Sequence, residues 1–183
     1  MKRSALHHHH QKFGALWTQL DGWELPASFG AVEQEVAQAR EGVGMADVSY
    51  LRKFESAAPQ TGSWKLASNR HLVMSERLSA MPAGTLDITS VYSALLLAGP
   101  QTNPVLRKLT SLNLSHFANG SCAQASLAHA HAIMIREDLD SLLSYKVLVS
   151  RDYAESVWES VLHAGREFHI APFGLNALDR LRS

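Results

Sequence analysis

The sequence has little cysteine, no excess of charge of either sign and no long apolar run. Its single cysteine, Cys122, excludes an internal disulfide framework and fits a reducing compartment. With 17 basic and 17 acidic residues the formal net charge is zero, so nothing attracts the chain to nucleic acid or to anionic lipid. The longest clear apolar run, Ala94 to Ala98, is far shorter than the roughly 20 residues that span a bilayer. We therefore expect a cytoplasmic protein whose partners are neither nucleic acid nor membrane.

The length and composition indicate one globular domain. The chain has 183 residues, of which 46% are hydrophobic and 19% charged, which suffices for a packed core. We expect residues 1–183 to form a single domain in which residues 1–30 are an extended amino-terminal arm. Asp21, Gly22 and Pro26 interrupt regular structure in this arm.

The spacing of apolar residues predicts an α+β fold, with strands interleaved with separate helices. The helix near the end is the clearest, because apolar residues repeat along one helical face between Ser150, a predicted cap, and Gly165. We expect the other helices at about 30–40 (capped by Ser28), 69–81, from Asn103 onward, and through Leu178 and Leu181; turns at 82–84 and 119–120; and strands at about 45–54, 64–67, 88–98, 122–128, 131–136 and 142–149.

Histidine and cysteine are the residues most able to bind a metal. Four consecutive histidines, His7–His10, can bind a transition metal, but adjacent residues on a flexible arm do not form a preorganised site. His129 and His131 lie two apart on a predicted strand, with His116 and Cys122 nearby in sequence, yet no pair has the spacing of a known zinc motif. We expect no physiological metal site, and we interpret Cys122 as a buried, inert thiol.

The acidic side chains give no convincing catalytic pair. Glu33 and Glu35, and likewise Glu137 and Asp138, are expected on solvated helix faces or turns. A glycine pair at residues 42 and 44 follows a helix, whereas a dinucleotide-binding loop follows a strand. The residues alone therefore identify no catalytic group.

Four segments, in order, resemble the glycine-cleavage T-protein (aminomethyltransferase) family. They are "LHHHHQKFGALWTQLDGWELPASFG" (residues 6–30), "EQEVAQAREGVGMADVS" (33–49), "LDITSVYSALLLAGP" (86–100) and "DYAESVWESVLHAG" with "APFGLNALDRLR" (152–182). The resemblance implies a shortened, folate-binding type of α+β domain with antiparallel sheets packed with helices. It also implies tetrahydrofolate as a candidate ligand and places Tyr50 and Leu51, at the end of the "DVS" strand, as candidate contacts to it.

The second half is also similar to the gamma subunit of heterotetrameric sarcosine oxidase. The "GP" turn and its helix, then "GSCAQASLAHA" (residues 120–130) and "YKVLVSRDYAESVW" (145–158), carry this similarity. It implies a subunit without chemistry of its own, in a complex of amine or one-carbon metabolism.

The sequence departs from the T-protein family where that family holds folate. The acidic "GG-x-x-DD" segment has no counterpart between Phe54 and Trp64, where Glu55 is the only acid. The glutamate that ends "TGYTGEDGxE" is replaced by Lys146, and the arginine of "GLGARD" by Leu178. A pterin without these partners loses roughly 1–3 kcal/mol per missing hydrogen bond.

Two hypotheses follow. The first is a noncatalytic subunit that acts through protein partners, with no folate bound. The second is an aminomethyltransferase-like protein that binds tetrahydrofolate through a rebuilt site. An open sheet edge left by the shortening would also favour self-association, so we expect a homodimer where no other subunit is present.

Overall fold

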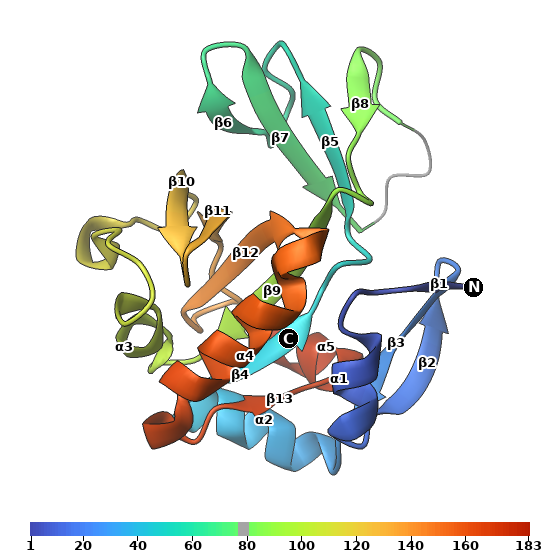
Figure 1. The fold of residues 1–183 in the computed structure, drawn as a ribbon, viewed down its shortest axis with the longest axis vertical. Coiled ribbons are helices and arrows are strands. Elements are labelled where there is room, and N and C mark those ends of the chain that lie inside the picture. Colours follow the sequence, from blue (N-terminus) through green and yellow to red (C-terminus); the bar gives the residue numbers. More distant parts are fainter. Residues whose placement is uncertain (77–80) are drawn as a thin grey trace.

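The computed structural model describes residues 1–76 and 81–183. Three sheets, seen in Figure 1, organise these residues: a three-stranded sheet ordered β1-β3-β2, a six-stranded sheet ordered β10-β11-β12-β9-β4-β13, and a four-stranded sheet ordered β6-β7-β5-β8. All strand pairs are antiparallel except β1 with β3 and β13 with β4. The strands are β1 (Lys2–Arg3), β2 (Leu16–Leu20), β3 (Trp23–Ser28), β4 (Gly44–Asp47), β5 (Arg52–Ser56), β6 (Trp64–Ala67), β7 (Arg70–Ser75), β8 (Thr85–Asp87), β9 (Tyr92–Ala98), β10 (Cys122–Leu127), β11 (Ala130–Arg136), β12 (Ser144–Ser150) and β13 (Ala171–Pro172).

Five α-helices accompany the sheets in the described part of the chain. The helix α4 lies in front of the six-stranded sheet in Figure 1, beside α3. The helix α5 packs against α2 and β3, and α1 lies next to the three-stranded sheet. Their bounds are α1 (His7–Lys12), α2 (Val32–Glu41), α3 (Thr102–Arg107), α4 (Ala154–Ala164) and α5 (Leu175–Leu181), and short 3₁₀ turns cover Leu114–His116, Arg151–Tyr153 and Arg166–Phe168.

The central strand β9 explains how one sheet supports two cores. Successive side chains of a strand point to opposite faces. Leu95 and Leu97 therefore enter the core that contains Trp158 of α4, while Leu96 enters the second core with Leu178 of α5. The predicted apolar run is thus a strand buried on both faces. The alternation makes the six-stranded sheet the layer on which both helical layers pack.

The strand and helix predictions hold for most of the second half. Strands β10, β11 and β12 lie where the sequence predicts them, and α4 ends at Gly165 as expected. The predicted cap at Ser150 is wrong in detail, because a 3₁₀ turn separates it from α4 and its side chain makes no capping hydrogen bond. The predicted start, with Asn103 as the cap and Pro104 as the first helical residue, is two residues late, since α3 begins at Thr102 after the cap residue Gln101.

The first half differs more from the prediction. The prediction of an irregular, extended arm is wrong, because residues 1–30 fold into β1, α1, β2 and β3. Residues 45–54 are two strands of different sheets, β4 and β5, with a turn between them. The helix expected at 69–81 is wrong where it can be compared, because Arg70–Ser75 is strand β7; residues 77–80 lie outside the described residues. Ser28 is in β3 rather than a cap, since α2 begins after Ala31.

Candidate functional site

The turn between β4 and β5 carries the two predicted ligand-contacting residues, Tyr50 and Leu51. The turn is fixed from several sides: the Ser49 hydroxyl accepts a hydrogen bond from the Ala94 amide at 3.0 Å, and the Asp47 carboxylate accepts one from the Ser49 amide at 2.9 Å. Tyr50 and Leu51 are both buried, at 7% and 2% exposure. The chain therefore holds these side chains in defined positions rather than on a flexible loop.

Tyr50 lines a surface cavity of about 860 Å³ between the three-stranded sheet, β8 and α5. Its hydroxyl donates a hydrogen bond to Glu76 Oε1 at 3.4 Å, and Glu76 forms an ion pair with Arg182. Burial, with the nearby Glu76 carboxylate, raises the pKa of the Tyr50 phenol to about 12. The phenol is therefore a neutral hydrogen-bonding group at physiological pH and not a base.

Leu51 lines a second cavity, of about 540 Å³, which also contains Trp64 and Met74. Glu76 and Arg182, which form an ion pair, line both cavities, so the two cavities adjoin at this pair. Neither residue is predicted as a site residue from the sequence. The carboxy-terminal arginine of the "GLNALDRLR" segment was the one available signal, and nothing marked Glu76, which follows a strand predicted as a helix.

Lys146 and Leu178 occupy very different surroundings. The Lys146 amine lines the second cavity but forms an ion pair with Glu137. Leu178 is fully buried among the apolar side chains of the second core. Of these two residues, Lys146 lines the second cavity with its charge already paired, and Leu178 lines neither cavity.

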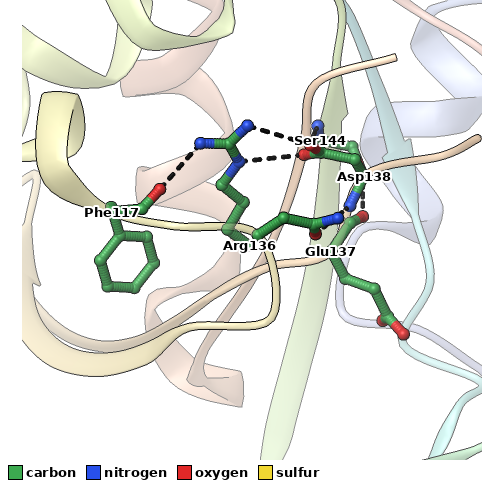
Figure 2. A network of polar contacts seen from close by, with 6 residues as sticks. Phe117, Arg136, Glu137, Asp138 and Ser144 are labelled. Carbon is green, nitrogen blue, oxygen red and sulfur yellow. Dashed lines mark hydrogen bonds and ion pairs between the residues drawn. The ribbon is translucent and has the colours of Figure 1, made fainter. Parts of the chain in front are cut away.

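The wall beside Lys146 is a structural network rather than a set of free acids (Figure 2). Arg136 donates to both carboxylate oxygens of Asp138, at 3.1 and 2.9 Å, and to the Phe117 carbonyl at 2.8 Å. Asp138 also accepts from the Ser144 amide at 3.2 Å, and the Ser144 hydroxyl donates to the Glu137 carbonyl. The hydrogen bonds to Asp138 raise the pKa of the Arg136 guanidinium. The expectation of a solvated turn is wrong for Asp138, whose side chain is 13% exposed.

The histidine run is part of the folded domain. His7–His10 form most of α1, and the His10 Nε2 lies 2.9 Å from Asp47 Oδ2 in a buried pair. His129 and His131 are exposed at one end of the β10–β11 hairpin, whereas Cys122 lies at its other end. Within residues 1–76 and 81–183, no three His, Cys, Asp or Glu side chains are grouped so as to hold a metal. Burial raises the pKa of the half-buried Cys122 thiol to about 11, so it stays protonated.

Comparison with known proteins identifies the scaffold. Residues 65–183 match the profile of the GCVT N-terminal domain. The chain belongs to this family. The resemblance predicted from the sequence is thereby confirmed, and the sheets and helices of the domain agree with the α+β class.

Several aminomethyltransferases are curated relatives of this GCVT-type chain. That of Acidobacterium capsulatum is 25% identical over 238 residues, covering all of this chain and 62% of its own length. That of Halothermothrix orenii is 22% identical over 230 residues and is covered over 64% of its length. The chain thus spans less than two thirds of these relatives. The alignments are also longer than the 183 residues of this chain, so the relatives have additional residues within the matched span.

Two solved structures share the fold of this GCVT-type chain. The glycine cleavage system aminomethyltransferase T from Bartonella henselae superposes with a TM-score of 0.79 at 18% identity, covering 99% of this chain and 62% of the other. A chain of heterotetrameric sarcosine oxidase from Corynebacterium sp. U-96 superposes with a TM-score of 0.65 at 18% identity, covering 91% of this chain and 96% of the other. The second neighbour is therefore similar in length as well as in fold.

No helix in the described ranges is long and apolar enough to cross a membrane.

Proposed function

We propose that this chain is a noncatalytic T-protein-like subunit that acts through protein partners in amine or one-carbon metabolism, in the cytoplasm. One observation carries the proposal. The position at which the family's pattern has a pterin-binding glutamate holds Lys146, already paired with Glu137, and the position of its arginine holds the fully buried Leu178. The scaffold is retained, and these residues do not fit tetrahydrofolate in the manner of that pattern.

The match to sarcosine oxidase supports the role of a subunit. The solved chain that is covered over 96% of its length comes from a heterotetramer, and a shortened domain of this family can therefore work as one member of an assembly. By analogy we propose flavin-bearing or folate-bearing partner proteins for this chain. In such a complex the domain provides a binding surface for the other subunits and no catalytic group.

Size-exclusion chromatography with light scattering is expected to show the chain in a larger complex when it is mixed with the products of neighbouring genes. Alone, it is expected to form a homodimer of about twice its 20.1 kDa mass. Addition of DNA or anionic vesicles should leave the elution unchanged, because the net charge is zero. A monomer that joins none of the candidate proteins would contradict the proposal.

A second candidate function is tetrahydrofolate binding through a rebuilt site. The observation that favours it is an acid and an arginine, Glu76 and Arg182, beside the predicted contacts Tyr50 and Leu51. In the structure these two charges pair with each other. A ligand that binds either charge would have to break this ion pair. The free energy lost with the pair would offset part of the free energy gained on binding.

Calorimetry with tetrahydrofolate and its 5-formyl derivative separates the two functions. We expect no saturable heat at high micromolar ligand for the wild-type chain, and saturable heat for an aminomethyltransferase such as the A. capsulatum relative, used as the positive control. The variant Glu76→Gln tests the rebuilt site, since it removes the partner of Arg182. Saturable heat from the wild-type chain that Tyr50→Phe or Arg182→Gln abolishes would establish the second function in place of the first.

A further inference from the structure

A lysine without any exposed surface contacts the turn that carries Tyr50 and Leu51. Lys53, on β5, has 0% exposure. Its amine donates hydrogen bonds to the Ser49 carbonyl at 2.9 Å and to the Leu51 carbonyl at 2.8 Å. A buried ammonium is costly unless it is paired or hydrogen-bonded, so these two bonds are the main compensation for burying this side chain.

The two carbonyls lie on either side of Tyr50, so the Lys53 amine clamps the turn across that residue. The backbone of Lys53 is itself fixed, because its amide donates to the Thr89 hydroxyl at 3.0 Å and its carbonyl accepts from the Ile88 amide at 2.9 Å. Tyr50 faces the first cavity and Leu51 the second. One amine therefore fixes the position of one wall in each cavity.

The charged groups around Lys53 act on it from a distance. Asp47, on β4, and Asp87, on β8, both favour its protonated form. Asp47 is already engaged by His10, and Asp87 by Arg52. Among the described residues no carboxylate forms an ion pair with Lys53 within 4.0 Å. The amine is thus held by carbonyl dipoles and not by a direct counter-charge.

We propose that Lys53 is a positioning residue whose amine is a proton-dependent clamp on the Ser49–Leu51 turn, so that the walls of both cavities move when the amine loses its proton. The clamp sets the shape of both cavities, whichever ligand or partner the domain binds.

The chemistry of the amine gives the direction of the effect. Burial lowers the pKa of Lys53 to about 8. Deprotonation converts two charge-assisted hydrogen bonds into neutral ones, which are roughly half as strong. Above that pH the turn is therefore held less firmly, and Tyr50 and Leu51 gain freedom at the boundary between the two cavities.

Nuclear magnetic resonance of the full chain tests this directly. The protein is labelled with ¹³C in the lysine ε-carbons, the tyrosine rings and the leucine methyls, and titrated from pH 7 to 10. Tyr50→Phe, Leu51→Met and Lys53→Met assign the three signals. We expect the Lys53 ε-carbon, the Tyr50 ring and the Leu51 methyls to shift together, with one midpoint near pH 8. The Tyr50 phenol does not titrate in this window, because its own pKa is about 12.

Two variants at the same position serve as controls. Lys53→Arg retains a cation throughout the range and is expected to keep the Tyr50 and Leu51 signals at their low-pH positions up to pH 10. Lys53→Met retains every other amine of the chain and is expected to show no transition. A wild-type Tyr50 signal that does not follow the Lys53 titration would overturn the proposal, and so would the same transition in Lys53→Met. Both variants remove the Lys53 ε-carbon signal, so if one of them fails to fold, the other still assigns that signal and the wild-type titration decides the question.

Discussion

Replacing Glu35 by alanine is expected to lower the free energy of unfolding by about 3 kcal/mol, although the sequence places this residue among solvated acids. The Glu35 side chain is buried, and one carboxylate oxygen accepts hydrogen bonds from the amides of Phe29 and Gly30 at 2.6 and 3.0 Å. The other oxygen accepts from the Gly174 amide at 2.9 Å. Removing the carboxylate leaves three amide donors without their acceptor, at roughly 1–3 kcal/mol for each that stays buried.

The matched control lies two residues away on the same helix. Glu33 pairs with Arg180, but its side chain is 71% exposed, and an exposed ion pair contributes little to stability because water and salt screen it. Urea denaturation of Glu35→Ala and Glu33→Ala should therefore give clearly different midpoints at the same slope. Equal and small losses in both variants would mean that water replaces Glu35 at these amides.

The close packing around Glu35 also explains why residue 174, in the carboxy-terminal segment, is a glycine. A Cβ on Gly174 would lie 2.2 Å from the Ala27 carbonyl oxygen and 2.5 Å from the Ser28 nitrogen. Both atoms are backbone, so neither can rotate away. The start of α5 is therefore pressed against the end of β3, and Glu35 holds the two together. This explains why the carboxy-terminal segment needs glycine before "LNALDRLR".

The sequence predicted the parts of the fold whose signal is local. The helix α4 has a full apolar face, β9 is an apolar run of strand length, and β12 contains a short apolar run, so periodicity and length identify them. Strand β7 was mistaken for a helix because Leu72 and Val73 are adjacent apolar residues that fit either pattern. Its pairing with β5 and β6 decides between the two patterns, and that pairing lies outside the local sequence.

Long-range partners account for most of what the sequence could not show. The arm appeared irregular because its short elements are stabilised by contacts with distant residues, such as His10 with Asp47 and Arg3 with Glu24. The candidate site shows the same limit. Tyr50 and Leu51 were found through a resemblance, whereas Glu76 and Arg182 lie 106 residues apart in the sequence. Only the folded chain brings these four residues to adjoining cavities.

Asp47→Ala is expected to destabilise the protein by about 3–5 kcal/mol, the cost typical of removing one partner of a buried ion pair. The Asp47 side chain has no exposed surface, and that of His10 is 1% exposed. Alanine at this position would leave His10 and the Ser49 amide without their acceptor. It would thereby loosen α1 and the turn that carries Tyr50 together. Asp152→Ala, at an exposed aspartate, is the control and should change stability by no more than about 0.5 kcal/mol.

The pH dependence of stability tests whether the charge of the Asp47 carboxylate causes this stabilisation. Burial alone would raise the pKa of Asp47, but the hydrogen bond and charge of His10, with hydrogen bonds from Ser4 and Ser49, outweigh it and lower the pKa. A carboxyl whose pKa is lower in the folded than in the unfolded state stabilises the fold above its unfolded pKa of about 4, and this stabilisation disappears as the pH falls through the folded value. The difference in unfolding free energy between wild type and Asp47→Ala should therefore decrease as the pH falls below about 4. If the difference were unchanged at pH 3, packing of the side chain, and not its charge, would be what Asp47 contributes.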